Sequence, residues 1–484
     1  MNHVELPRTE LFIDGSWVAG HGDGFVVQNP TNGSQLAELH GADAADVDHA
    51  IAAARRAFES GPWNTMSGAD RGRLISRLAD LVEENAERFA GLEALDVGKP
   101  YKDALMVDVA MAAETFRHMA GWADKIQGSV IPVPDHMGKA RLSYTERLPL
   151  GVVGAITPWN APTMITSWKI ASAFAAGCTV VLKPSEEAPL VTQLLAELVA
   201  QAGFPRGVLN VVNGPGNIVG AALIEHSGID KLSFTGSPEV GRLVGIAAAR
   251  AFKPATLELG GKSPQIVFAD ADVAALAPVA AISLFANSGQ TCAAGTRVLV
   301  HRSKLDEVAE ALAAEAAKQR LGNPFDPTTT MGSLISERQR NRVVDYIDAG
   351  HAEGARLIAG GGTPDRPGYF VEPTVFVGDN DMRISREEIF GPVGTIIPFD
   401  DTNDAVRLAN ATAYGLAAVI WTRDINAAMI ASRGIKVGTV WVNSFGPPHP
   451  ATPWGGMQTS GLGRELGLSG VLANTEERLV NVVY

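Results

Sequence analysis

Cysteine is scarce in this chain, which has only Cys178 and Cys292 among its 484 residues. Two cysteines provide neither a disulfide framework nor the spacing of a zinc site, so we expect a reducing, cytoplasmic setting and no bound metal. Long hydrophobic runs are also missing. The longest, 170–182, is flanked by lysines and is too short to span a membrane. It predicts a buried helix that ends at Gly177 and is followed by a buried strand.

Positive charge is in deficit, with 40 Lys and Arg against 53 Asp and Glu and a formal net charge of −13. This balance argues against a surface that binds nucleic acid or an anionic membrane, and it says little about small substrates. Residues 1–7 lack the basic start and the apolar run of a signal peptide. The length predicts about three domains, or two large ones, with an ample core.

Strands and helices alternate from residue 151 onward. Before that point, helices are expected at 43–60, 68–97 and 102–125. Short apolar strands are predicted at 151–156, 179–182, 208–212 and 231–234, and after Glu258 a second series follows near 264–268, 296–301, 393–398, 417–421 and 439–442. This rhythm predicts an α/β fold of two domains, each with a parallel sheet covered by helices on both faces. The boundary is expected near 259–261.

The C-terminal residues 478–484 alternate between polar and apolar types and are strongly β-prone. Proteins rarely leave the edge of a strand bare. We therefore expect this strand to pair either with another subunit or with a sheet of its own chain, and the sequence leaves both arrangements open.

Small residues surround Cys292 in the segment 289–295. They let the backbone approach a substrate closely and leave the thiol uncrowded, and a thiolate attacks a carbonyl carbon well. A lone cysteine is also a common small core residue, so the segment by itself leaves both interpretations open. Cys178 directly precedes a predicted buried strand and is interpreted as a core residue.

Two polar residues are candidate partners for such a thiol. Asn160 follows the strand 151–156, and active groups in parallel sheets collect at the carboxyl ends of strands. Its amide could donate to an oxyanion, or it could simply form a turn. Glu258 lies between two leucines, which would raise its pKa and suit it to general-base catalysis. The alternative is a solvent-facing residue at the end of a strand.

Three turns are candidate nucleotide contacts. Lys183 and Glu186 could hydrogen-bond a ribose, although 184–186 also has the pattern of an ordinary helix start. The glycines of 214–220 resemble a dinucleotide fingerprint but do not have its spacing. The turn 235–237 precedes a helix and would suit a pyrophosphate.

Taken together and in their order along the chain, the motifs quoted below resemble those of the NAD(P)-dependent aldehyde dehydrogenase superfamily. The resemblance begins at 12–15 and extends into the C-terminal strand, so it covers nearly the whole chain. It is carried by Thr157-Pro158-Trp159-Asn160, Lys183-Pro184-Ser185-Glu186, Phe234-Thr235-Gly236-Ser237, Glu258-Leu259-Gly260-Gly261-Lys262-Ser263-Pro264, Gly289-Gln290-Thr291-Cys292, Glu388-Ile389-Phe390-Gly391-Pro392 and Ser460-Gly461-Leu462-Gly463-Arg464-Glu465.

The resemblance implies a role for each matching residue. Cys292 is expected to be the nucleophile and Glu258 the general base, and Asn160 with the backbone N–H of Cys292 would form the oxyanion hole. The implied cofactor contacts are Ile156, Trp159, Lys183, Glu186, Gly216, Phe234, Gly236, Ser237, Leu259, Glu388 and Phe390. Among these, Lys183 and Glu186 would hold the adenine ribose and Ser237 the pyrophosphate. Glu388 and Phe390 would hold the nicotinamide ribose and ring.

The expected reaction is oxidation of an aldehyde to its carboxylic acid through a thiohemiacetal and a thioester on Cys292. Glu186 can accept from a free 2′-hydroxyl and would repel a 2′-phosphate, so NAD is expected rather than NADP. Phe116, Met164, Trp168, Phe285 and Phe445 either line a funnel to Cys292 or belong to the core, and the sequence leaves both open. If they line it, the funnel would favour apolar aliphatic or aromatic aldehydes. Trp454, where the family commonly has phenylalanine, is expected to reshape that funnel. Gln458, where it usually has lysine, is expected to alter a local contact.

The resemblance also implies a domain division and an assembly. Residues 1–127 and 149–258 would form the dinucleotide-binding domain and 259–445 the catalytic domain. A small β extension for oligomerisation, 128–148 with 470–484, would join a homodimer or homotetramer, and 446–469 would return near the mouth of the active site. Two other classes stay open: a cofactor-independent cysteine hydrolase and a non-catalytic binding protein.

Overall fold

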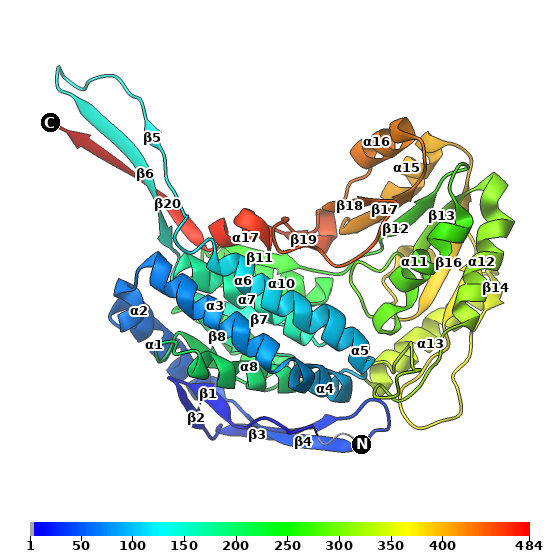
Figure 1. Cartoon of the computed structure of the whole chain (residues 1–484), viewed down its shortest axis with the longest axis horizontal. Coiled ribbons are helices and arrows are strands. Elements are labelled where there is room, and N and C mark those ends of the chain that lie inside the picture. The colour runs from blue at the N-terminus through cyan, green and yellow to red at the C-terminus, as the bar shows by residue number, and fades with distance from the viewer. Residues whose placement is uncertain (1–3) are drawn as a thin grey trace.

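Two large sheets and one projecting small sheet organise the chain (Figure 1). The computed structural model describes residues 4–484. The first large sheet has eight strands in the order β19-β11-β10-β7-β8-β9-β1-β2, and the second has seven in the order β14-β15-β16-β13-β12-β17-β18. Both are parallel except at their edges, where β1, β2, β19 and β14 run antiparallel to their neighbours. The predicted pair of α/β sheets is therefore confirmed.

The strands of the first sheet are short and mostly buried. Their bounds are β1 Leu11–Ile13, β2 Ser16–Val18, β7 Val152–Ile156, β8 Thr179–Lys183, β9 Leu209–Val211, β10 Lys231–Thr235, β11 Ala255–Glu258 and β19 Gly461–Leu462. Those of the second sheet are β12 Pro264–Val267, β13 Arg297–His301, β14 Arg356–Ala359, β15 Thr374–Val377, β16 Val393–Phe399, β17 Ala417–Trp421 and β18 Thr439–Val442. The central strands of both sheets were predicted from the sequence, whereas β14 and β15 were not.

Helices cover both faces of each sheet. Alternate residues of the first sheet, such as Val152 and Val153, pack against different helices, since successive side chains of a strand point to opposite faces. The principal helices of this half are α1 Ala44–Glu59, α3 Gly68–Glu84, α4 Ala86–Asp96, α6 Ala110–Ala120, α7 Pro162–Ala176, α8 Leu190–Gln201 and α10 Pro238–Arg250. Those of the other half are α11 Val273–Phe285, α12 Leu305–Ala317, α13 Glu337–Ala352, α15 Thr402–Asn410 and α16 Ile425–Gly434.

Shorter helical elements join these units. They are α2 Pro62–Thr65, α5 Tyr101–Asp103, the π-helical η1 Ala104–Val109 and η2 Gly216–Gly220, α9 Ala221–Glu225, the 3-10 turns η3 Ala286–Gly289, η4 Arg302–Lys304 and η5 Gln458–Ser460, α14 Arg383–Arg386 and α17 Gly467–Leu472. The helix predicted at 68–97 is two helices that meet at Asn85, whose side chain donates to the carbonyl of Leu81 instead of continuing the helix. The helix predicted at 102–125 is interrupted by η1.

The predicted buried helix and strand at 170–182 are confirmed as the end of α7 and the strand β8. Helix α7 ends at Gly177, whose φ of 93° lies in the left-handed region that favours glycine. Its carbonyl accepts a hydrogen bond from the indole of Trp63 at 2.9 Å. Every residue of α7 except Met164 is buried, so the helix lies inside the core, between the sheet and the outer helices α3 and α6.

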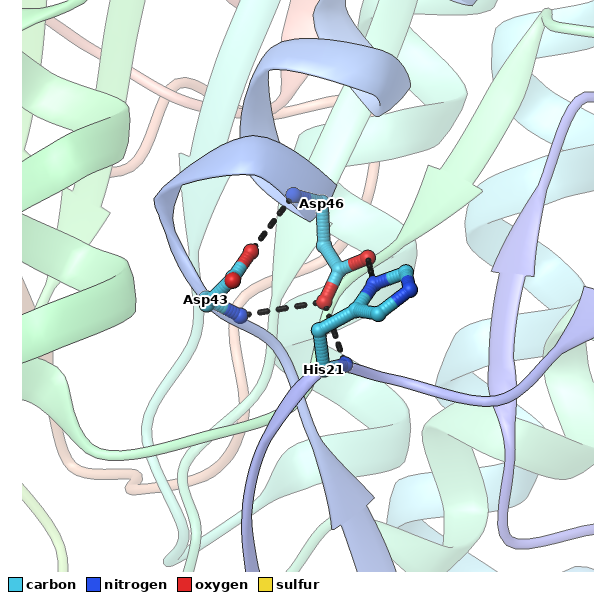
Figure 2. A group of neighbouring side chains, drawn as sticks. All are labelled: His21, Asp43 and Asp46. Carbon is cyan, nitrogen blue, oxygen red and sulfur yellow. Dashed lines mark hydrogen bonds and ion pairs between the residues drawn. The ribbon is translucent and has the colours of Figure 1, made fainter.

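A compact cap fixes the start of α1 (Figure 2). The Asp43 carboxylate accepts from the backbone N–H of Asp46 at 2.9 Å, and the Asp46 carboxylate accepts from the N–H of Asp43 at 3.1 Å. Asp46 also accepts from the N–H of His21 at 2.8 Å and raises the pKa of the His21 ring. These three form the one cluster with metal-ligating spacing among residues 4–484. Their contacts explain them as a helix cap.

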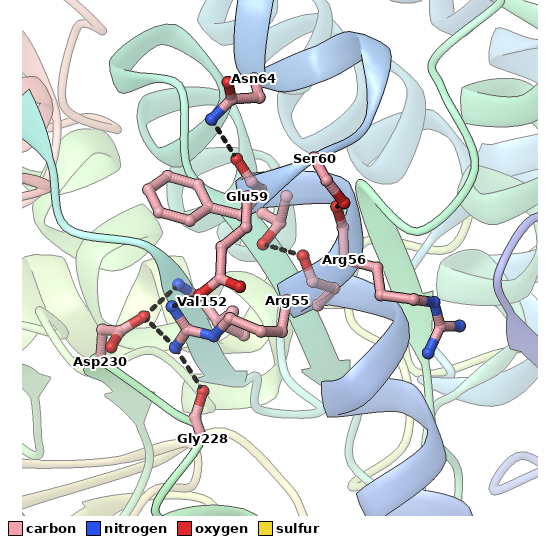
Figure 3. A network of polar contacts seen from close by, with 11 residues as sticks. Arg55, Arg56, Glu59, Ser60, Asn64, Val152, Gly228 and Asp230 are labelled. Atoms are coloured by element: carbon pink, nitrogen blue, oxygen red, sulfur yellow. Dashed lines mark hydrogen bonds and ion pairs between the residues drawn. The ribbon is translucent and has the colours of Figure 1, made fainter.

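A second polar network ties α1 to the amino ends of β7 and β10 (Figure 3). Arg55 donates to the carboxylate of Asp230 at 2.5 Å and to the carbonyl of Gly228 at 2.9 Å. The same Asp230 oxygen accepts from the N–H of Val152 at 2.7 Å. Gly151, with a φ of 130°, passes so close that a Cβ would lie 2.0 Å from this oxygen. The network therefore fixes the amino ends of β7 and β10. The candidate site described below lies at their carboxyl ends.

The small third sheet projects from the body, with the C-terminus near its tip (Figure 1). It consists of β5 Val130–Ile131, β6 Arg141–Pro149 and β20 Thr475–Val483, in the order β20-β6-β5. The C-terminal strand thus pairs with β6 of its own chain, along its whole length. A separate hairpin joins β3 Gly22–Gln28 to β4 Gln35–Gly41. No helix within residues 4–484 is long and apolar enough to cross a membrane.

Candidate active site

A cavity of about 540 Å³ opens at the carboxyl ends of β7, β10 and β11. Helix α13 and the turn 388–390, from the other half of the chain, complete its wall. Of the predicted site residues, the cavity wall contains Trp159, Asn160, Gly236, Ser237, Glu258, Leu259, Cys292, Glu388 and Phe390. The remaining predicted contacts, Ile156, Lys183, Glu186, Gly216 and Phe234, lie outside this wall. The grouping follows from topology, because parallel strands bring their carboxyl ends to one edge.

Cys292 lies in the cavity wall and is partly exposed, whereas Cys178 is fully buried. The Cys178 thiol points to the carbonyl of Asn474 at 3.3 Å, which confirms its interpretation as a core residue. Burial raises the pKa of the Cys292 thiol to about 12, and the carboxylates of Glu388 and Glu258 add to this effect. A nucleophilic role for Cys292 thus requires a base that removes its proton.

Asn160 is joined directly to the loop that carries Cys292. Its side-chain amide Nδ2 donates to the carbonyl of Gln290 at 2.9 Å. In return, Asn287 donates to the carbonyl of Asn160 at 2.8 Å. The Asn160 side chain is buried and faces the same cavity as Cys292. It is therefore more than the exposed turn residue that the sequence allowed.

Glu258 ends β11 and is only 4% exposed, so the solvent-facing alternative is wrong. Neither of its carboxylate oxygens has a hydrogen-bond partner in the described part of the chain. Burial raises the pKa of Glu258 well above its usual value, and Glu465 adds to the increase. Glu465 is itself paired with the buried Lys169 at 2.6 Å. A buried carboxyl with a raised pKa and unused oxygens is suited to accept a proton.

The turns after β8 and β9 meet through one carboxylate. Glu186 Oε2 lies 2.8 Å from Lys183 Nζ, and its Oε1 accepts from the N–H of Gly216 at 3.4 Å. Lys183 is buried and its ammonium lowers the pKa of Glu186, although burial opposes that effect. Three residues from separate parts of the sequence thus form one polar cluster.

The turn after β10 provides close backbone approach and a helix N-terminus. A Cβ on Gly236 would lie 2.5 Å from the ring of Phe234, so a larger residue would not fit there. Ser237 caps α10 by accepting from the N–H of Val240 at 3.3 Å. The buried hydroxyl of Thr235 has no partner among residues 4–484. These groups offer donors to an anionic ligand.

The turn 388–390 faces this side from the second half of the chain. Glu388 accepts from the N–H of Gly261 at 3.0 Å, and burial raises its pKa to about 7. A Cβ on Gly260 would lie 2.1 Å from the Glu388 carboxylate. The rings of Phe390 and Trp159 meet edge to face, with centroids 5.2 Å apart. This contact joins the two halves of the chain across the cavity.

Helix α13 supplies residues that were not predicted from the sequence. Gln339 donates to the carbonyl of Phe390 at 2.8 Å, and Arg342 donates to the carbonyl of Glu388 at 2.7 Å. Both side chains line the cavity, as does Tyr414. Polar residues three apart share one face of a helix, which is a signal that could have marked Gln339 and Arg342. The turn that this face contacts was not evident from the sequence.

The predicted substrate funnel is partly wrong. Phe116 and Phe285 are 0% and 2% exposed and belong to two different core clusters. They are core side chains because their helices bury those faces. None of the five predicted funnel residues, which also include Met164, Trp168 and Phe445, lies in the cavity wall.

Two of the predicted funnel residues, Trp168 and Phe445, belong to a row of aromatic rings. The Trp168 ring lies 6.2 Å from that of Trp454, which is 6.1 Å from Trp441, and Trp441 is 5.3 Å from Phe445. Cys292, Met164 and Trp441 pack against the core cluster that contains Trp168 and Trp454. The unusual Trp454 thus takes part in this row, while Gln458 begins the turn η5 with a φ of 54°.

Comparisons with known proteins agree with this geometry. The model of the aldehyde dehydrogenase family matches residues 17–480, and the chain belongs to this family. It is 44% identical to human retinal dehydrogenase 2 over 484 residues, which cover 99% of this chain and 93% of that protein.

Among solved structures, an NAD+ complex of an aldehyde dehydrogenase from Bacillus cereus matches with a TM-score of 0.96 and 45% identity, covering 98% of this chain and 96% of that one. Betaine aldehyde dehydrogenase from Staphylococcus aureus, in complex with NAD+, matches with a TM-score of 0.95 and 40% identity over 98% and 95% of the two chains. The protein is therefore an NAD(P)-dependent aldehyde dehydrogenase, which oxidises aldehydes to acids with a nicotinamide cofactor. Its predicted fold is also confirmed.

Proposed function

We propose that this enzyme uses NAD to oxidise an apolar aliphatic or aromatic aldehyde through a thioester on Cys292, and that Glu258 activates the hydrolytic water. The observation that carries this proposal is the shared cavity wall. Cys292, Asn160 and a buried Glu258 line it together, and both Glu258 oxygens are unused by the residues described. This arrangement provides a nucleophile, a donor and a base in one place.

The first step needs a thiolate. Because burial raises the pKa of Cys292 to about 12, its proton has to be removed; the thiol is partly exposed, so a water can carry this proton to solvent, and Glu258 stays free for the later step. The sulfur then bonds to the aldehyde carbon and the carbonyl oxygen becomes an oxyanion. The Asn160 amide and the Cys292 backbone N–H are the donors that would stabilise this charge.

The second step oxidises the carbon and the third releases the product. The carbon bonded to Cys292 then loses a hydride, for which a nicotinamide held by Glu388 and Phe390 would supply the acceptor when bound. The thioester on Cys292 then remains, and Glu258 removes a proton from a water that attacks its carbonyl. The C–S bond breaks, the thiolate leaves and the carboxylic acid is released.

The residues present fit a dinucleotide. Glu186 can accept from ribose hydroxyls, and the Ser237 turn at the start of α10 can receive a pyrophosphate. A Cβ on Gly236 would clash with the Phe234 ring and one on Gly260 with the Glu388 carboxylate, so these glycines allow two of the proposed contact residues to keep their places. Glu388 with Phe390 would hold the nicotinamide end, and Ile156, Trp159, Lys183, Gly216, Phe234 and Leu259 complete the proposed contacts. Glu186 favours NAD, because its carboxylate would repel a 2′-phosphate.

The aromatic row supports an apolar substrate. Trp168 and Trp454 are buried members of the core cluster against which Cys292 packs, so the surroundings of the thiol on this side are apolar. Among the relatives, one is named for retinal and another for betaine aldehyde. Aromatic rings can also hold a quaternary ammonium group through cation–π contacts, so both classes belong in a substrate panel.

We further propose a homodimer or homotetramer that is joined through the projecting sheet. Strand β20 has β6 on one side, and Leu479, Val482 and Val483 on it are exposed. The domain boundaries stated from the sequence and the cytoplasmic setting stay predictions. Deleting 476–484 and measuring mass by light scattering tests the assembly: we expect a smaller species, and an unchanged mass would contradict this role of the tail.

The test of the proposed chemistry mixes the protein with NAD or NADP and a panel of aliphatic, aromatic and quaternary ammonium aldehydes. We expect NADH formation that is lost in Cys292→Ala and kept in the matched control Cys178→Ala. Full turnover in Cys292→Ala would overturn the mechanism. Ester cleavage without any NADH formation would favour a cysteine hydrolase.

A further inference from the structure

The loop before Cys292 has an unusual backbone conformation. Asn287, Ser288 and Gly289 all have positive φ values, 51°, 56° and 71°. Non-glycine residues rarely adopt such values, and two in succession persist only where the surroundings hold them in place. Whatever holds this loop also determines where the Cys292 thiol and backbone N–H lie.

The side chain of Gln290 is the main tether of this loop. It is fully buried, and both ends of its amide are bonded. Its Oε1 accepts from the N–H of Ile335 at 2.9 Å, and its Nε2 donates to the carbonyl of Asn287 at 3.1 Å. The first bond attaches the loop to the segment before α13, and the second closes the left-handed turn on itself.

The backbone of Gln290 controls the amide of Asn160. The Gln290 carbonyl accepts from Asn160 Nδ2 at 2.9 Å and from Asn287 at 3.2 Å. An asparagine amide has two N–H donors. With one of them fixed on Gln290, the direction of the other is determined, and Asn160 faces the cavity with Cys292.

We propose that Gln290 is a positioning residue, which aligns the Asn160 amide and the Cys292 peptide as the two donors of the oxyanion hole. The proposal rests on the proposed function of Asn160 and Cys292. Gln290 acts through these residues and needs no contact with substrate or cofactor. Because small misplacements of reacting groups cost about 100-fold in rate, loss of its side-chain bonds should slow the chemistry while leaving cofactor binding intact.

The test compares Gln290→Met with a matched control, Gln265→Met. Gln265 is also fully buried and donates to the carbonyls of Gly295 at 3.0 Å and Ala280 at 3.2 Å, and its side chain has no bond to Asn160 or to the left-handed turn 287–289. Both substitutions keep the side-chain length and remove the bonds. The readouts are kcat, the KM and Kd for NAD, the melting temperature and the rate of Cys292 alkylation by iodoacetamide.

We expect Gln290→Met to lower kcat by about 100-fold with KM and Kd for NAD within about twofold of wild type. Gln265→Met should lower the melting temperature as much but keep kcat within about threefold. In an Asn160→Ala background, Gln290→Met should cost less than about tenfold, since part of its effect passes through Asn160. A kcat within threefold of wild type in Gln290→Met, or an equal loss in Gln265→Met, would overturn the proposal.

A second variant keeps the test decisive if Gln290→Met does not fold. Gln290→Glu retains the acceptor for Ile335 and loses the donor to Asn287, and it should lower kcat by about tenfold; no loss would overturn the proposal. Alkylation is measured without aldehyde or cofactor, so it reports a change in the Cys292 environment whether or not the proposed reaction takes place. A failure of the proposed function is detected separately, as full turnover in Cys292→Ala.

Discussion

The two ends of the proposed cofactor site differ in how their polar groups are hydrogen-bonded. We call the end at Lys183, Glu186 and Gly216 the adenosine end and the end at Cys292 and Glu258 the chemical end. At the adenosine end, Lys183, Glu186 and Gly216 are bonded to one another. At the chemical end, the two oxygens of Glu258 are buried and have no partner within residues 4–484. A buried polar group that lacks a hydrogen bond costs about 1–3 kcal/mol. Under the proposed function, the first end is organised for binding, and the second keeps its hydrogen-bonding capacity for reacting groups.

Electrostatics separate the two ends as well. The ammonium of Lys183 lowers the pKa of Glu186 against the effect of burial. At the chemical end, burial and neighbouring carboxylates raise the pKa values of Glu258 and Cys292. Raised pKa values of an acid and a thiol are typical of groups that exchange protons.

After Cys292→Ala, the largest effect on steady turnover should come from Glu258→Gln, because the amide cannot accept a proton. General-base catalysis is worth about 10²–10⁴-fold, and we expect a loss in that range. In the wild type, the carboxyl is protonated below its raised pKa, so kcat should rise with pH as Glu258 ionises. The control variant Cys178→Ala should keep this wild-type pH profile. The same rise of kcat with pH in Glu258→Gln would remove Glu258 from this role.

The adenosine end should respond in binding and leave the chemistry intact. We expect Glu186→Gln to weaken NAD binding by about tenfold, as loss of a charged hydrogen bond does, and to reduce the discrimination against NADP. Fluorescence titration with both cofactors measures this. Glu187→Gln is the control, since Glu187 pairs with Arg338 at 2.7 Å instead of with Lys183. Equal effects in the two variants would contradict a specific role of Glu186.

The buried carboxyl of Glu258 should change how the stability of the fold depends on pH. Because the pKa of Glu258 is raised in the folded state, the unfolded chain releases this proton first, and stability falls as pH rises from the unfolded pKa through the folded one. Glu258→Gln removes that loss, worth about 1.4 kcal/mol for each pKa unit. The melting temperature of the variant relative to wild type should therefore increase with pH. A constant difference would contradict the raised pKa.

The smallest effect on activity should come from a change at the amino ends of β7 and β10, which lie opposite the site. Arg55→Gln removes the contacts with Asp230 and Gly228, and we expect a loss of about 1–2 kcal/mol in unfolding free energy, discounted for partial exposure. Turnover per folded molecule should be unchanged. The neighbouring Arg56→Gln is the control, because its contact with Asp14 at 3.5 Å is exposed and such pairs contribute about 0–1 kcal/mol. Chemical denaturation distinguishes the two.

Much of this architecture could be predicted from the sequence because parallel strands are short, apolar and buried on both faces. Asn160 was marked by its place after a strand and Glu258 by its two leucine neighbours. Strands β14 and β15 were missed because they form an antiparallel pair with no helix between them and so lie outside the strand–helix rhythm.

The remaining site residues depend on contacts that periodicity does not encode. A phenylalanine is equally suited to line a cavity or to fill a core, and only packing shows that Phe116 and Phe285 are core residues. Gln339 and Arg342 were missed for a related reason: their importance comes from the turn 388–390, which is distant in sequence and reaches α13 only in the folded chain.

The proposed reaction passes through a thioester on Cys292, which is hydrolysed by a water that Glu258 activates. The most direct measurement mixes Glu258→Gln rapidly with NAD and an aldehyde, follows NADH absorbance, and determines the mass of the Cys292 peptide. We predict a burst of about one NADH per active site, then a stall with an acyl group on Cys292. Continued turnover at the wild-type rate, or a burst that leaves Cys292 unmodified, would contradict the claim.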